Sequence, residues 1–178
     1  MKEVVVLLRG VMPTGKNKIP KMSELVTILE EAGFKDVRTY IQSGNVILKT
    51  DLSDEEIKNK IHKVILDKIG ADLKIIIKTK NELEIAIKEN KFKEDYDFSR
   101  IHLAFTNDEI NSEKLKEVQD IVFEGEILNL GSNCFYMYLP RDSKKKKLNN
   151  NFLEKKLGIT LTTRKLNVIQ KLYGMMRW

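Results

Sequence analysis

Cysteine is nearly absent from the chain. Only Cys134 is a cysteine among 178 residues, which excludes an intrachain disulfide, a cysteine-rich zinc site and a CxxC redox motif. A chain of this length with 42% hydrophobic residues can form a core without such cross-links. Because free thiols are typical of a reducing compartment, we predict a cytoplasmic protein.

Long apolar runs are absent as well. The first such run, residues 4–8, is too short for the core of a signal peptide and is followed by Arg9. No stretch approaches the roughly 20 apolar residues that a membrane helix needs. We therefore expect no membrane partner.

Positive charge is spread unevenly along a chain with a formal net charge of +6. Residues 141–178 carry 11 basic residues against two acidic ones, whereas residues 81–126 carry 13 acidic residues against six basic ones. Residues 2–21 are again basic. If the two ends of the chain meet, they form a basic surface that attracts small anions or nucleic acid. The alternative is an ordinary lysine-rich, solvated surface.

The apolar pattern of residues 1–79 predicts an N-terminal half with alternating strands and helices. Glycines and prolines in residues 9–21 predict a loop, and Ser53 with Glu56 forms a capping-box pattern at the start of a helix. A polar turn at residues 42–45 joins two β-rich runs. The expected elements are a strand at residues 4–8, a helix at 22–32, strands at 37–41 and 46–48, a helix at 53–69 and a strand at 73–77.

The same order recurs in residues 101–178, after a linker helix and connection at residues 80–100. Its expected elements are a strand at residues 101–105, a helix at 112–122, strands at 126–130 and 134–139, a helix at 148–157, a strand at 159–163 and a final helix at 166–173. The order βαββαβ is the split pattern of ferredoxin-like folds. We therefore predict an α+β fold of two tandem ferredoxin-like halves with antiparallel sheets, plus a C-terminal helix.

Several blocks of the sequence resemble one family. They are Leu-Leu-Arg-Gly at residues 7–10, Gly-Lys-Asn-Lys-Ile-Pro at 15–20, Arg-Thr-Tyr-Ile-Gln-Ser-Gly-Asn-Val at 38–46, Leu-Pro at 139–140, Lys-Leu at 147–148, residues 152–158 and Thr-Thr-Arg at 162–164. In this order they resemble the bacterial family known as domain of unknown function 1697. The resemblance implies a duplicated ferredoxin-like fold in a bacterial cytoplasmic protein, and it implies no particular activity.

The first candidate site is the glycine-bearing loop after the first strand. Arg9, Lys16, Asn17 and Lys18, together with backbone amides that the glycines leave accessible, can bind a phosphate or a carboxylate. The loop is not a Walker A motif because the GxxxxGK[ST] spacing is absent. In the alternative interpretation the glycines serve only the turns and the lysines are solvated.

The second candidate is the polar turn between the two β-rich runs. Gln42, Ser43 and Asn45 can form hydrogen bonds with a base edge or a sugar. Residues of these types also form turns without any ligand, and turn formation is the alternative.

The third candidate is the segment before the final helix. The hydroxyls of Thr162 and Thr163, with Arg164 and the helix dipole, can hold an anion. Capping of the helix N-terminus is the alternative.

No catalytic residue can be identified from the sequence. Cys134 lies in an apolar run, which favours a buried, inert thiol. His62 and His102 have no second ligand at a diagnostic spacing, so we predict no metal site and no cofactor. Tyr136 and Tyr138 share one face of a strand, where they form either a stacking platform for bases or part of the core.

We therefore predict a binding protein whose basic surface takes an anionic ligand, with nucleic acid the leading class. One alternative is an enzyme acting on a small phosphorylated or carboxylated substrate, in which Arg9, Lys16 or Arg164 stabilises charge. Another is a homodimeric interaction module that pairs through a sheet edge.

Overall fold

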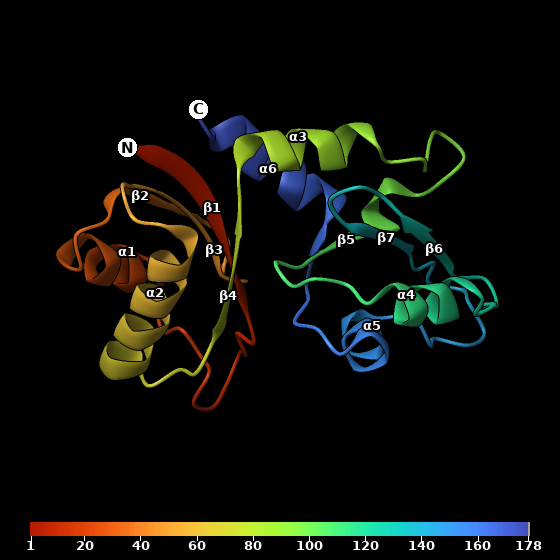
Figure 1. Cartoon of the computed structure of the whole chain (residues 1–178), viewed down its shortest axis with the longest axis horizontal. Coiled ribbons are helices and arrows are strands. Elements are labelled where there is room, and N and C mark those ends of the chain that lie inside the picture. The colour runs from red at the N-terminus through yellow and green to blue at the C-terminus, as the bar shows by residue number, and fades with distance from the viewer. Residues whose placement is uncertain (178) are drawn as a thin grey trace. The chain divides into compact units, whose positions relative to one another are not determined.

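The computed structural model of the chain describes residues 1–177. Within this range the chain forms two four-stranded antiparallel sheets and six α-helices (Figure 1), which confirms the predicted mixed α+β class. It divides into two units, residues 1–80 with residues 172–177, and residues 81–171. No helix of the described range is both long and apolar enough to span a membrane.

The first unit contains the sheet with strand order β2-β3-β1-β4, in which β1 lies between two antiparallel neighbours. Its elements are β1 (Lys2–Arg9), α1 (Met22–Glu31), β2 (Lys35–Tyr40), β3 (Asn45–Thr50), α2 (Asp54–Ile69) and β4 (Lys74–Lys78).

Side-chain alternation along β1 separates the two faces of this sheet. Val4, Val6 and Leu8 join the core that α1 and α2 cover (Figure 1). The predicted capping box forms as expected, since Ser53 and Glu56 bond each other's backbone N–H groups at the start of α2. Residues of the opposite parity, from Glu3 to Arg9, belong to the second face of the sheet.

The second unit repeats this arrangement, because its strand order β6-β7-β5-β8 places the second, third, first and fourth strands in the same sequence. Its elements are α3 (Lys80–Lys88), β5 (Ile101–Phe105), α4 (Ser112–Gln119), β6 (Ile127–Leu130), β7 (Phe135–Tyr138), α5 (Asn150–Leu157), β8 (Thr162–Lys165) and α6 (Leu166–Met175). Two of these helices lie at a boundary between the units: α3 begins there, and α6 extends across it.

Both faces of the second sheet are covered within its own unit. One face packs against α4 and α5, and α3 lies on the other (Figure 1). The Tyr136 hydroxyl donates to the Ala86 carbonyl of α3 at 2.6 Å, and the ring of Tyr138 lies 5.5 Å from that of Phe92. Tyr136 is 1% exposed and belongs to the core, whereas Tyr138 is half-buried beneath the rings of Phe92 and Tyr96.

The last strand begins later than the sequence predicts. The expected strand covers residues 159–163, whereas β8 begins at Thr162. The reason is that side chains bind the preceding backbone: the N–H groups of Thr160 and Leu161 donate to the carboxylates of Asp108 and Glu154, at 2.8 Å each. These groups are therefore not available to the sheet.

Candidate functional site

A pocket lies where the loop after β1 meets the turn between β2 and β3, within the first unit. Its volume is about 450 Å³. We call it the loop–hairpin pocket, and its lining residues are Val11, Met12, Pro13, Lys18, Ile19, Pro20, Gln42 and Ser43. It thus brings together Lys18, Gln42 and Ser43, which come from two of the three segments singled out in the sequence.

A close backbone approach at Gly44 holds the turn against the loop. The Gly44 carbonyl accepts a hydrogen bond from the Leu8 N–H at 2.9 Å. Gly44 has a φ of +88°, and a Cβ atom there would lie 2.9 Å from side-chain carbons of both Leu8 and Val11. Only glycine fits both the left-handed backbone and this contact.

The polar side chains of the turn have structural partners. Gln42 Nε2 donates to the Ile19 carbonyl at 2.6 Å and fastens the loop to the turn. Asn45 is fully buried, and its Nδ2 donates to the Tyr40 carbonyl at 3.0 Å and to Ser43 Oγ at 2.9 Å. Turn formation therefore accounts for Asn45, whereas the exposed Gln42 and Ser43 also line the pocket.

The loop is held in a defined conformation by Asn17. Its carboxamide accepts from the Asp72 N–H at 3.0 Å and donates to the Asp72 carbonyl at 3.4 Å. Its backbone carbonyl accepts from the Met12 N–H at 3.0 Å. Lys16 and Lys18 are exposed on this ordered loop, so their ammonium groups are positioned without a large entropic cost to the backbone.

The turn also contains a strained apolar residue. Ile41 has a φ of +51°, a conformation that β-branched residues rarely adopt, and its side chain is 48% exposed. Met12 of the loop is 55% exposed. Strain and exposed apolar surface beside a pocket are features found at binding sites.

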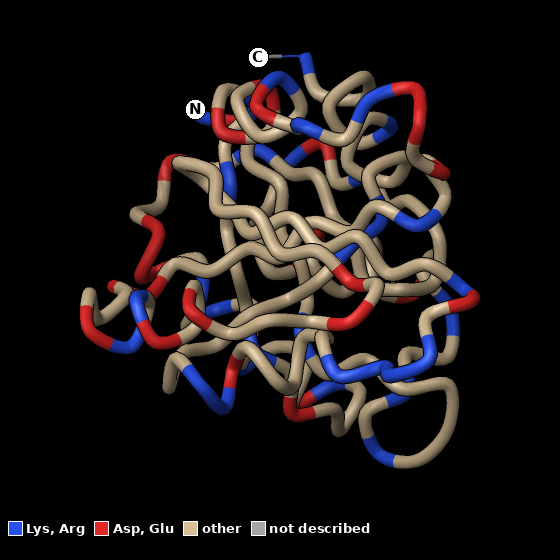
Figure 2. The backbone as a smooth tube through the Cα atoms, turned by 90° about the vertical axis from the view of Figure 1, so that its right-hand side faces the viewer, with Lys and Arg blue, Asp and Glu red and all other residues tan. Residues whose placement is uncertain are grey.

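The electrostatic character of the pocket is positive. No Asp or Glu is among the described residues that line it, and Lys18 contributes a cation. Arg9 lies at the end of β1 opposite the exposed Lys74 of β4. Elsewhere both signs alternate along the backbone, with Lys and Arg positions interspersed among Asp and Glu positions (Figure 2).

The third predicted segment belongs to the second unit and lies in β8. Thr162 and Arg164 are buried, and Arg164 Nη1 donates to Thr162 Oγ1 at 2.6 Å. Thr163 Oγ1 donates to Asn150 Oδ1 of α5 at 2.8 Å. These side chains thus make contacts inside their own unit, and their role in ligand binding stays a prediction.

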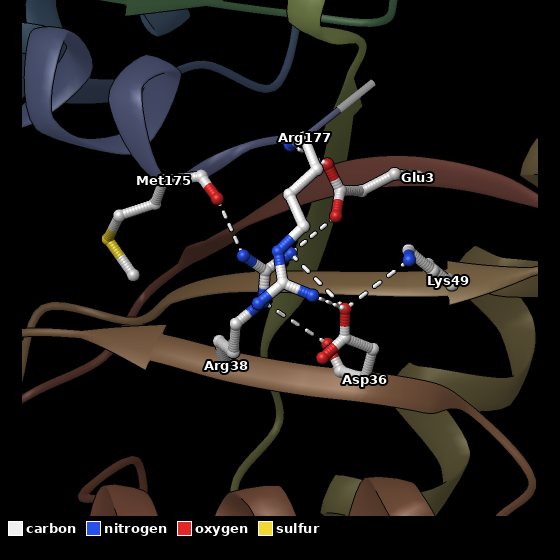
Figure 3. Close-up of polar contacts among 6 residues, drawn as sticks. All are labelled: Glu3, Asp36, Arg38, Lys49, Met175 and Arg177. Atoms are coloured by element: carbon white, nitrogen blue, oxygen red, sulfur yellow. Dashed lines mark hydrogen bonds and ion pairs between the residues drawn. The ribbon is translucent and has the colours of Figure 1, made fainter.

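A cluster of charges that sequence reasoning missed lies on the second face of the first sheet (Figure 3). We call it the Arg38 cluster, and its members are Glu3, Asp36, Arg38, Lys49 and Arg177. Arg38 pairs with the carboxylate of Glu3, whose side chain is fully buried, and donates to the Met175 carbonyl at 2.6 Å. The backbone N–H of Arg177 donates to Glu3 at 2.6 Å.

Asp36 completes the Arg38 cluster with three cationic neighbours. Its Oδ2 lies 3.2 Å from Arg177 Nη1, 3.5 Å from Lys49 Nζ and 3.8 Å from Arg38 Nη2. Because both carboxylates are engaged by cations and backbone N–H groups, the cluster ties the chain after α6 to β1 and β2. This geometry indicates a role in stabilising the structure. Only Arg38, inside a family-like block, gave any sequence signal.

The described residues were also compared with the requirements of a metal site. Among residues 1–177, no group of three or more His, Cys, Asp or Glu side chains is placed to hold a metal ion. Cys134 is buried, as its position in an apolar run predicted.

The chain was compared with proteins of known structure and family. The solved structure of the conserved bacterial protein SP0830 from Streptococcus pneumoniae is similar, with a TM-score of 0.71, 21% sequence identity and 98% of each chain covered. At that identity the likeness concerns the fold alone. No curated protein matches the sequence. The family model described as "Protein of unknown function (DUF1697)" matches residues 1–136, more than half of the chain, and the chain therefore belongs to this family.

Proposed function

We propose that the chain binds single-stranded nucleic acid and that the loop–hairpin pocket holds one nucleotide. The observation that carries the proposal is the convergence of Lys18, Gln42 and Ser43 on a pocket that also has an apolar lining and no carboxylate. Nucleotides combine an anionic phosphate with a flat, largely apolar base, and the pocket offers a partner for each.

The residues divide between these two parts of the ligand. Lys18 and the neighbouring exposed Lys16 interact with phosphates, whose neutralisation releases counterions. Met12, Pro13 and Pro20 provide apolar surface against the face of a base. Gln42 uses Nε2 to bind the Ile19 carbonyl, and its carboxamide oxygen can accept a hydrogen bond from a base amino group.

Binding is favoured over catalysis by the residues that line this pocket. The lining has no Asp, Glu, His or Cys, which are the usual general acids, bases and nucleophiles. A phosphorylated ligand would therefore be held there without a group positioned to transfer a proton.

The test is fluorescence anisotropy with labelled single-stranded RNA and DNA over a range of salt concentrations. We expect binding that weakens as salt rises, and an affinity about fivefold lower for Lys18→Gln, because one phosphate contact is lost. Lys63→Gln is the matched control, since Lys63 is exposed on α2 of the same unit outside the pocket. Absence of binding at low ionic strength, or equal losses for both variants, would contradict the proposal.

The finer description of the fold is part of the same proposal. We infer that residues 1–79 and 101–178 are ferredoxin-like halves joined by residues 80–100, in a cytoplasmic protein. The matching strand orders of the two sheets support the fold assignment. An experimental structure with a different strand order in either half would contradict it.

A further inference from the structure

Lysines flank one aromatic ring in the sequence of α5 and of the segment before it. Residues 144–156 contain six lysines and one acidic residue, Glu154. The lysines are exposed, and Phe152 is half-buried. We call Phe152 with the lysines at positions 144–147, 155 and 156 the Phe152 surface. All of it belongs to the second unit, whereas the loop–hairpin pocket belongs to the first.

Two lysine ammonium groups lie over the ring of Phe152. Lys147 Nζ is 5.6 Å and Lys156 Nζ is 5.8 Å from the ring centroid. Lys156 follows Phe152 by four residues on α5, so the two side chains lie on one side of the helix. The ring of Phe123 packs nearly perpendicular to that of Phe152, with centroids 5.7 Å apart. The fold thus presents an aromatic ring together with two cations.

Hydrogen bonds fix the backbone that carries these side chains. The carboxylate of the buried Glu126 accepts from the N–H groups of Lys147 and Leu148, at 2.8 and 2.9 Å. The side chain of Asn149 accepts from the Phe152 N–H at 2.8 Å and caps α5. The exposed lysine side chains therefore extend from an ordered backbone, which lowers the entropic cost of binding a ligand.

Acidic side chains neutralise little of the charge on this surface. Lys145 lies 3.6 Å from a carboxylate oxygen of Glu124, and both side chains are largely exposed, at 74% and 65%, where ion pairs contribute little. Glu154 accepts from the Leu161 N–H at 2.8 Å. Within residues 1–177, Lys145 is the only lysine of the surface in an ion pair. The surface thus retains positive charge for an anionic ligand.

We propose that the Phe152 surface is a second contact for single-stranded nucleic acid, in which a base stacks on Phe152 and the lysines bind the flanking phosphates. Proteins that bind single strands combine positive charge with aromatic rings on which bases stack. Stacking of a base is stronger than the contact of an exposed ammonium with a ring, so the base displaces Lys147 and Lys156 toward the phosphates. The inference rests on the function proposed above for the class of ligand, and it concerns residues of the other unit.

The ring is tested by fluorescence anisotropy of the full chain with a labelled single-stranded RNA of mixed sequence. We expect an affinity about tenfold lower for Phe152→Leu, because leucine removes the stacking face and keeps an apolar side chain against the core. Phe152→Tyr retains a ring and should bind like the wild type. Circular dichroism checks that both variants fold. Equal affinities of Phe152→Leu and the wild type overturn the proposal.

Inorganic polyphosphate separates the two parts of the ligand, because it carries phosphates and no bases. By calorimetric titration, Lys147→Gln and Lys156→Gln should each lower the affinity for RNA and for polyphosphate about threefold, whereas Phe152→Leu should weaken RNA binding alone. Lys88→Gln is the matched control, since Lys88 is exposed on α3, which lies on the opposite face of the second sheet. Equal losses of polyphosphate affinity in Phe152→Leu and Lys156→Gln, or equal losses in Lys88→Gln and Lys156→Gln, contradict the proposal.

The variants separate this inference from the function proposed for the loop–hairpin pocket. A loss of RNA affinity in Lys18→Gln without a loss in Phe152→Leu supports the pocket and overturns the Phe152 surface. The reverse pattern supports the Phe152 surface and contradicts the pocket. Absence of RNA binding by the wild type at low ionic strength overturns both.

Discussion

The two units share a strand order, and they differ most at the connection after the first strand. In the first unit residues 10–21 connect β1 to α1, whereas in the second unit only residues 106–111 connect β5 to α4. The longer loop carries three lysines and no acid, and the shorter one carries Asp108 and Glu109. The loop–hairpin pocket, which we propose as a binding site, thus lies where one half departs from the other in length and in charge.

The second faces of the two sheets also differ in the interactions that hold them. In the first unit the Arg38 cluster fastens residues 172–177 to β1 and β2 through ion pairs and backbone hydrogen bonds. In the second unit α3 accepts a hydrogen bond from Tyr136 of the sheet, and the connection after α3 packs the rings of Phe92 and Tyr96 on Tyr138. The comparison predicts ionic sensitivity in one unit and sensitivity to apolar packing in the other.

Among the variants that test this comparison, Arg38→Ala should cause the largest loss in the free energy of unfolding. The substitution leaves the Glu3 carboxylate, whose side chain is fully buried, without its guanidinium partner. Breaking one side of such a pair costs about 3–5 kcal/mol of the free energy of unfolding. Urea denaturation measures this, with Lys2→Ala as the control, since Lys2 forms only an exposed pair with Asp54 worth at most about 1 kcal/mol. Equal losses in the two variants would show that the cluster fastens nothing.

A smaller loss is expected for Gly44→Ala, which tests the close approach behind the pocket. The new Cβ would lie 2.9 Å from side-chain carbons of Leu8 and Val11, and overpacking of this kind costs about 1–3 kcal/mol, to which the left-handed backbone adds about 1 kcal/mol. Gly15→Ala isolates the backbone contribution, because Gly15 has a φ of +82° and nothing within 4 Å of a Cβ atom. Thermal unfolding should separate the two variants, and a common midpoint would contradict the contact.

Tyr136→Phe in the second unit should cause a still smaller loss in the free energy of unfolding. The change removes the hydroxyl that donates to the Ala86 carbonyl and leaves the ring in place, so it should cost about 1–2 kcal/mol. Tyr96→Phe provides a comparison, because the Tyr96 ring packs on Tyr138. Urea denaturation at neutral pH measures both. A loss for Tyr136→Phe as large as that for Arg38→Ala would remove the difference proposed between the two faces.

Local signals predicted most of the fold. The capping pair Ser53 and Glu56, the turn glycines and the alternation of apolar residues in β1 each depend on neighbours in sequence, and all form as expected. The predicted start of β8 was wrong because it depends on hydrogen bonds from the backbone to the side chains of Asp108 and Glu154. Asp108 is also distant in the sequence. Such contacts leave no periodic pattern in the sequence.

The candidate site was predictable only in its separate pieces. Residue types identified the loop with Lys18 and the turn with Gln42 as polar and flexible, but they gave no indication that Gln42 bonds Ile19 and that both segments line one pocket. The Arg38 cluster was missed because Glu3 and Arg177 are joined only by the folded chain. Pairing across long sequence separations is set by topology, which a single sequence specifies only indirectly.

The smallest expected effect is a pH dependence of stability, which should differ between the units because different groups titrate in each. Burial lowers the pKa of His102 on β5 of the second unit, while its hydrogen bond with the Arg100 carbonyl acts in the opposite direction. As pH falls through the ordinary histidine value of 6.5, the unfolded chain gains a proton that the folded state resists, so stability falls. In the first unit the lowered pKa of Glu56, caused by its hydrogen bonds with Ser53, acts only below the ordinary value of 4.5. Urea denaturation at a series of pH values measures this loss of stability, and hydrogen exchange assigns it to one unit. As pH falls, the second unit should lose stability first, and His102→Gln should abolish that first loss. A first loss in α2, or an unchanged step in the variant, would assign the sensitivity to other groups.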